Sequence, residues 1–136
     1  GAGNMAHNLD FIPDDRLNWK PAPTAKSALE IVNHLLGYAF ASARLLRGGA
    51  FDMTQFRPAQ TRAEAQEMLR RLGEEYPEAL RMLAPEDLER TVELPFGTFP
   101  MSQAASMPVI DLLHHHGQIA YIQTLLGDEV PHFQND

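Results

Sequence analysis

The sequence contains no cysteine. This absence excludes disulfides, thiolate nucleophiles and metal sites with sulfur ligands, so any metal ion must be held by nitrogen and oxygen atoms. Long hydrophobic runs are missing as well, and no segment approaches the ~20 apolar residues of a membrane-spanning helix. The first residues also lack the basic and apolar regions of a secretory signal. We therefore expect a cytoplasmic protein in a reducing compartment, with no membrane contact.

Positive charge is scarce. The chain has 11 Lys and Arg against 18 Asp and Glu, which gives a formal net charge of −7. Binding to nucleic acid depends on a cationic face that displaces counterions from the phosphates, and the few cations here are dispersed among acids. We expect no nucleic-acid partner.

The length of 136 residues predicts a single domain spanning residues 1–136. Apolar residues make up 44% and charged residues 21%, as in ordinary soluble globular proteins. Strand-like alternation is rare, whereas several segments show helical periodicity with recognisable starts. The predicted fold class is all-α.

Two capping boxes mark the clearest helix starts. Ser27 and Glu30 have the spacing of a box that opens a helix, which should run to about residue 46, before two glycines. Thr61 and Glu64 form a second box, opening a charged amphipathic helix that Pro77 should kink or divide.

The rest of the chain gives weaker signals. Residues 85–100 hold three prolines and a glycine, which favours an extended crossing connection over a helix. The last helix should start at Ser102 or Ser106 and end before Gly127. Before Pro13 there is room only for a short helix over residues 5–12.

Two histidines and one carboxylate fall on apolar helix faces. His115 lies in the stripe of the last helix, with Asp111 one turn before it, and His34 interrupts the stripe of the residue 27–46 helix. We expect all three to point inward. Because unpaired imidazoles and carboxylates are costly to bury, a shared divalent cation is the natural partner, and two imidazoles with one carboxylate leave positions open for water or substrate.

Plainer interpretations exist for each residue. A single histidine on an apolar face is usually a hydrogen-bonded core residue, and Asp111 with His115 could be only an intrahelical pair. His114 is turned to the side of the stripe and is expected to support the site at most. Gln118 is a candidate for orienting a ligand or water, and Tyr38 for lining a pocket.

Two segments carry a family resemblance. Leu17-Asn18-Trp19-Lys20-Pro21, followed by residues 26–35, resembles the segment of DinB-like proteins that leads into their second helix and carries the first metal histidine. His114-His115-His116-Gly117-Gln118-Ile119 and the following residues 121–128 resemble their last helix. The two matches bracket most of the chain.

The resemblance implies an up-down-down-up four-helix bundle with a divalent metal, nickel or zinc in first place and iron or manganese otherwise, held by three histidines. His34 matches the first ligand and His115 the third, while the second position, normally histidine, is Asp111. Relatives with known activity are thiol-dependent transferases and isomerases. We therefore expect a metal-dependent thiol S-transferase or hydrolase that acts on a small electrophilic molecule, and a low-molecular-weight thiol as possible cosubstrate.

The first helix departs from the family pattern because it has about half the usual length. A shortened first helix should expose an apolar groove, and such patches commonly mark interfaces, so we expect a homodimer. The alternative function is a non-catalytic helical-bundle module for dimerisation or interaction, with a degenerate metal site at Asp111.

Overall fold

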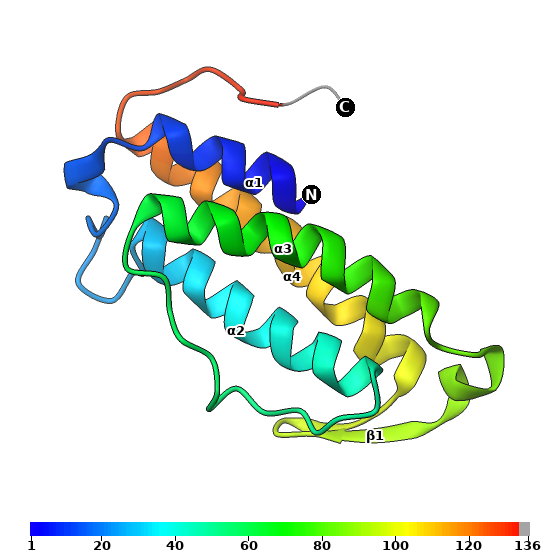
Figure 1. Ribbon diagram of the computed structural model, residues 1–136. Coiled ribbons are helices and arrows are strands. Elements are labelled where there is room, and N and C mark those ends of the chain that lie inside the picture. The colour runs from blue at the N-terminus through cyan, green and yellow to red at the C-terminus, as the bar shows by residue number, and fades with distance from the viewer. Residues whose placement is uncertain (134–136) are drawn as a thin grey trace.

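The computed structural model describes residues 1–133, which form four helices and one small β-hairpin (Figure 1). The elements are α1 (Ala2–Asn8), α2 (Ala28–Leu46), α3 (Arg62–Arg81), β1 (Thr91–Leu94), β2 (Gly97–Pro100) and α4 (Met101–Leu125). Short 3-10 helices cover Leu9–Phe11, Asp14–Arg16 and Pro85–Glu89. In Figure 1, α2 and α3 run in one direction and α1 and α4 in the other. The predicted helical up-down-down-up bundle with a short first helix is confirmed, and it carries one small hairpin in addition.

The capping box predicted for α2 is complete. The backbone N–H of Ser27 donates to the Glu30 carboxylate at 2.8 Å, and the N–H of Glu30 donates to the Ser27 hydroxyl at 3.2 Å. These bonds satisfy two of the amides that a helix start leaves without partners. The helix ends as expected, because Gly48 takes a left-handed φ of +85° just beyond it.

The capping box predicted for α3 is only half formed. The Thr61 hydroxyl accepts from the N–H of Glu64 at 3.2 Å, but the Glu64 carboxylate accepts from the N–H of Gln60. Pro77 lies inside α3 without dividing it. The last helix begins at Met101, in agreement with the earlier of the two predicted starts, and it accommodates Pro108.

The core is centred on α2, which packs between α3 and α4. Its buried face runs through Val32, Leu36 and Ala39, none more than 1% exposed. The largest fully buried side chains come from several elements: Met5, Leu9, Ile12, Leu35, Leu36, Leu69, Met101 and Ile119. Together with their neighbours they make one continuous hydrophobic core.

Residues 91–100, part of the predicted extended crossing connection, form the hairpin. Val92 pairs with Phe99, and Leu94 with Gly97. Val92 and Leu94 alternate with exposed neighbours and are buried, so they attach the hairpin to the bundle. At its base, the N–H of Met101 donates to the carbonyl of Arg90 at 2.8 Å. The hairpin thereby closes one end of the bundle.

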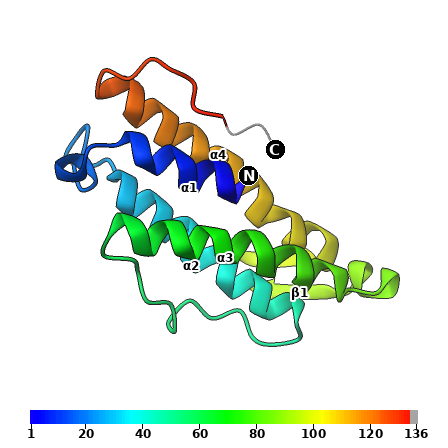
Figure 2. The ribbon, with the colours of Figure 1, turned by 45° about the horizontal axis from the view of Figure 1, so that its top comes forward.

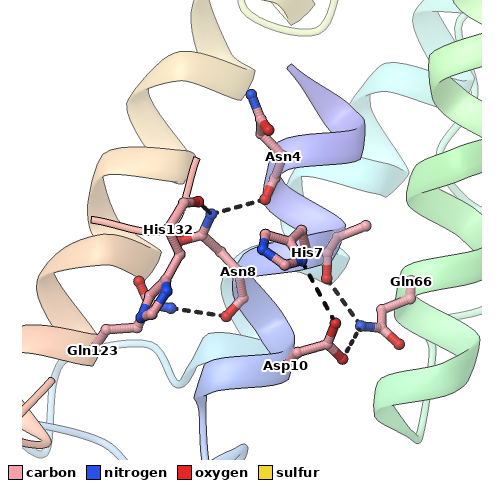
Figure 3. A network of polar contacts seen from close by, with 8 residues as sticks. Asn4, His7, Asn8, Asp10, Gln66, Gln123 and His132 are labelled. Atoms are coloured by element: carbon pink, nitrogen blue, oxygen red, sulfur yellow. Dashed lines mark hydrogen bonds and ion pairs between the residues drawn. The ribbon is translucent and has the colours of Figure 1, made fainter. Parts of the chain in front are cut away.

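A buried polar network fastens α1 to the segment that follows α4 (Figure 3). The Asn8 side-chain amide donates to the carbonyls of Asn4 at 2.9 Å and His132 at 2.8 Å, and the Gln123 amide donates to the carbonyl of Asn8 at 2.8 Å. The His132 ring stacks on Phe11. Figure 2 shows this segment running back along α4. The His132 side chain is only 13% exposed.

A cavity of about 270 Å³ lies directly beyond the start of α1. Its lining is apolar apart from one tyrosine hydroxyl and consists of Gly1, Ala2, Ala39, Leu72, Gly73, Tyr76, Pro77, Leu80, Pro108, Val109 and Leu112. This is the apolar groove expected of a shortened first helix.

Within residues 1–133, no helix has both the length and the hydropathy to span a bilayer.

Candidate functional site

The sequence-predicted residues His34, Asp111 and His115 meet where α2 packs against α4. The rings of His34 and His115 have centroids 5.2 Å apart and are nearly perpendicular, at 84°. The Nε2 atom of His115 lies 3.3 Å from Oδ1 of Asp111, one helical turn away. The fold therefore brings together three side chains from two separate helices.

The three residues differ in burial. His115 is 6% exposed and points inward, as predicted, and Asp111 is partly buried. His34 is exposed, so the prediction that it faces the core is wrong. The buried face of α2 is centred on Val32 and Leu36, which leaves His34 beyond its edge. The site is consequently open to solvent on the α2 side.

A short chain of hydrogen bonds fixes the His115 ring. Its Nδ1 lies 2.7 Å from Oε1 of Gln118, whose Nε2 lies 3.1 Å from Nε2 of His114. An amide oxygen only accepts and an amide nitrogen only donates, so Nδ1 of His115 carries the proton that binds Gln118. Its other nitrogen, Nε2, is then the one left to act as a ligand. Gln118, the candidate for orienting a ligand or water, thus contacts the His115 ring directly.

Nε2 of His115 is buried and has no hydrogen-bond partner. It lies 3.3 Å from Oδ1 of Asp111, which is an ion pair when the imidazole is protonated. With a neutral ring the two atoms are facing acceptors, and a metal cation between them would relieve their repulsion. Ligands at zinc–nitrogen and zinc–oxygen distances stand about 3.4 Å apart at the tetrahedral angle, close to the 3.3 Å found here. The pair suits a divalent cation. Within the described part of the chain, no three His, Asp or Glu side chains are already gathered closely enough to hold one.

The surroundings favour a neutral His34. Although His34 is exposed as a residue, partial desolvation of its ring lowers its pKa, and the neighbouring His115 and Lys26 lower it further, while Asp111 acts in the opposite direction. Neutral imidazole is the form that binds metals. Burial, followed by the Asp111 charge, raises the pKa of Tyr38, so its hydroxyl remains a hydrogen-bond donor at neutral pH.

We expect acid to destabilise the protein below the ordinary histidine pKa of 6.5. Burial lowers the pKa of both His34 and His116 in the folded state, so in this range the unfolded chain binds more protons. The contribution to stability is complete above pH 6.5 and is lost as the pH falls towards the lowered values. Thermal melts between pH 7.5 and 5.5 measure the loss. The His116→Gln variant should show a flatter dependence, and an unchanged slope would contradict this assignment.

A cavity of about 630 Å³ opens beside the site. At one end lie His34, Asp111 and His114, and the rest of the lining is Tyr38, Phe51, Met53, Pro95, Phe96, Met107 and Ile110. Tyr38 was expected to line a pocket, but the aromatic and methionine side chains from the 47–61 connection and the hairpin were missed. The alternation of Val92 and Leu94 before a Pro-Phe-Gly turn was the available signal for the hairpin.

Comparisons with known proteins agree with this architecture. The family model described as the DinB superfamily matches residues 3–119. An uncharacterised Bacillus subtilis protein, YjoA, is 26% identical over an alignment 136 residues long, which covers 96% of this chain and 88% of that protein. The crystal structure of YjoA, a DinB-like protein, has a TM-score of 0.74 at 21% identity, covering 98% of this chain and 91% of that one. A DinB-like protein from Bacillus cereus has a TM-score of 0.72 at 19% identity, covering 98% and 90%.

Proposed function

Since this chain belongs to the DinB superfamily, we propose that it is a metal-dependent enzyme, a thiol S-transferase or a hydrolase, that acts on a small electrophilic molecule. His34, Asp111 and His115 would hold the divalent cation, with nickel or zinc preferred over iron or manganese. The observation that carries the proposal is the buried, unpartnered Nε2 of His115 facing the Asp111 carboxylate at 3.3 Å.

His34 is free to complete the ligand set. Among the described residues no hydrogen bond holds its imidazole, which only contacts the edge of the His115 ring. An exposed side chain of this kind changes rotamer at little cost. Asp111 in place of a third histidine adds a negative charge and a hard oxygen donor, which widens the range of metals that the site accepts.

When bound, the cation would lower the pKa of a coordinated thiol or water and so supply a nucleophile at neutral pH. The residues around it have separate tasks. Gln118 keeps Nε2 of His115 aimed at the site through its 2.7 Å bond to Nδ1. The adjoining cavity admits the electrophile from the side of His34 and Asp111. Because the sequence has no cysteine, a thiol nucleophile must come from a small cosubstrate.

Elemental analysis of protein purified without a histidine tag tests the proposal directly. We expect one nickel or zinc ion per chain, either as purified or after incubation with the metal salt and gel filtration. The matched variant His34→Ala should retain less metal than wild type, because it removes one ligand without disturbing the core. Wild-type protein that leaves gel filtration without stoichiometric metal would eliminate the proposed centre.

The outer surface of α4 favours a second candidate function, a bundle module that dimerises. Its exposed apolar side chains are Val109, Ile110, Leu113, Tyr121 and Leu125. Gly117 lies within the same face, and a Cβ atom added there would meet nothing within 4 Å, so packing inside the chain does not explain this glycine. Glycine within a helix costs about 1 kcal/mol relative to alanine, and close approach of a second α4 would explain it.

We expect Leu113→Glu to convert a homodimer into monomers. Leu113 is 65% exposed at the centre of the apolar face, and an interface that buried it would bury the new charge without a partner. Met82→Glu is the matched control, since Met82 is 64% exposed outside α4. Light scattering coupled to gel filtration measures the mass of each variant. A monomeric wild type would remove the dimer proposal and leave the metal proposal untouched.

A further inference from the structure

The cavity beside the histidines has an uncharged lining except at one end. Among the described residues, no lysine or arginine lines it, and Asp111 is the only acidic residue in the lining. In the metal-free protein an anionic group entering the cavity would lose its hydration and gain no cationic side chain in return, which is costly. Its volume of about 630 Å³ lies within the range of small-molecule sites. The cavity therefore suits a small ligand with an uncharged body.

Aromatic rings form the walls of the cavity. The Tyr38 ring is tilted against Phe51, with centroids 5.7 Å apart, and against Phe96, with centroids 6.2 Å apart. Phe96 stands at the turn of the hairpin and is 58% exposed, so a ligand that covered it would bury a large apolar area. Rings at these angles offer both faces and edges to an aromatic ligand.

Among the described residues, Tyr38 supplies the only hydroxyl in the lining, and a sulfur atom accepts its hydrogen bond. The Tyr38 hydroxyl donates to Sδ of Met107 at 3.3 Å. A thioether sulfur is a weak acceptor, so a ligand oxygen in its place would form a stronger hydrogen bond with the Tyr38 hydroxyl. Tyr38 lies one helical turn beyond His34 on α2, and both residues line the cavity. A ligand oxygen that accepts from the Tyr38 hydroxyl would thus lie near the end of the cavity that His34 lines.

We infer that the cavity binds an uncharged aromatic molecule with a hydrogen-bond-accepting oxygen beside its ring. The ring would contact Phe51 and Phe96, and the oxygen would accept from the Tyr38 hydroxyl in place of Met107. In one respect the inference rests on the proposed function, because it identifies this molecule as the electrophile, with the carbon that bears the oxygen next to His34 and Asp111. Tyr38 is then a substrate-positioning residue.

Three probes of similar size test the inference in metal-free wild-type protein: acetophenone, ethylbenzene and benzoate. Titrations followed by backbone amide shifts give the affinity of each. Acetophenone should bind and shift amides of the hairpin and α2, whereas benzoate should bind at least several-fold more weakly. Benzoate binding as tightly as acetophenone would overturn the inference.

Two variants separate the hydrogen bond from the apolar contact. Tyr38→Phe should weaken acetophenone about five-fold, the value of one hydrogen bond, and leave ethylbenzene unchanged. Phe96→Ala should weaken both probes. Phe133→Ala is the control, because Phe133 is similarly exposed, at 69%, and lies outside this cavity. Equal effects of Tyr38→Phe on the two probes, or no effect of Phe96→Ala, would contradict the assignment.

The metal-free design keeps the two proposals apart. Binding of acetophenone without a metal supports the cavity assignment whatever the metal content of the protein. Stoichiometric metal with no binding of acetophenone would retain the centre and reject the aromatic ligand. Both measurements use the full chain.

Discussion

His115→Ala is expected to abolish the stabilisation of the folded protein by nickel or zinc. His115 supplies the buried Nε2 that faces Asp111, and no other imidazole is held in that position. A ligand that binds only the folded state stabilises it by about 2.7 kcal/mol at a concentration 100 times its dissociation constant. Wild type should therefore melt at a clearly higher temperature with metal than with EDTA, and the variant should melt at the same temperature in both.

His116→Gln is the control for this experiment. His116 neighbours His115 on α4 but lines a different cavity, beside the segment that follows α4. The control should keep the full metal-dependent shift. The EDTA melts separately report the cost of removing a buried ring that Gln118 holds at 2.7 Å. A metal-dependent shift in His115→Ala equal to that of wild type would disprove the role of His115.

Asn8→Ala is expected to lower the free energy of unfolding by about 2 kcal/mol, because two hydrogen bonds from a buried side chain are lost. Asn8 is 3% exposed, and its amide donates to the carbonyls of Asn4 and His132, which the variant leaves without this donor (Figure 3). Since α1 is only seven residues long, it depends on such tertiary contacts. Urea denaturation followed by circular dichroism measures the change.

Asn18→Ala makes the same chemical change at an exposed turn and should alter stability by less than about 0.5 kcal/mol. The comparison isolates the network from the general effect of replacing asparagine. Proteolysis adds a second readout, because loss of the bond to His132 should make the segment after α4 easier to cleave. If both variants unfold at the same urea concentration as wild type, the network contributes little to the attachment of α1.

Local signals in the sequence predicted the helices well. Ser27 and Glu30 form their two hydrogen bonds within one turn, so the box depends on nothing distant. The box at Thr61 formed only halfway, because the Glu64 carboxylate found the N–H of Gln60 instead. The backbone path just before the helix determines which of two adjacent N–H groups the carboxylate binds, and the spacing of residues in the sequence does not specify that path.

The position of His34 shows where helical periodicity fails. Ile31, Leu35 and Tyr38 form a regular stripe around His34, which predicted that all four face inward. However, α2 is apolar around most of its circumference, and contact with both α3 and α4 centres its buried face on Val32 and Leu36. When apolar residues surround most of a helix, the sequence alone does not show which of them face the neighbouring helices.

The cavity was beyond sequence analysis for a different reason. Tyr38, Phe51 and Phe96 come from α2, the 47–61 connection and the hairpin, and Phe96 reaches Tyr38 only because the hairpin folds over the end of the bundle. The pairing of two four-residue strands depends on their docking against helices, since an isolated hairpin is marginal in water. Their proximity is a property of the assembled fold.

The turn and the base of the hairpin have separate structural roles. Its turn contributes Pro95 and Phe96 to the cavity, while its base is clamped by the bond between Met101 and Arg90. A change in the length or composition of the turn would reshape the chamber without moving any of the four helices. Under the aromatic-ligand proposal, a change of ligand would then require substitutions in this short stretch alone, with the bundle inherited unaltered.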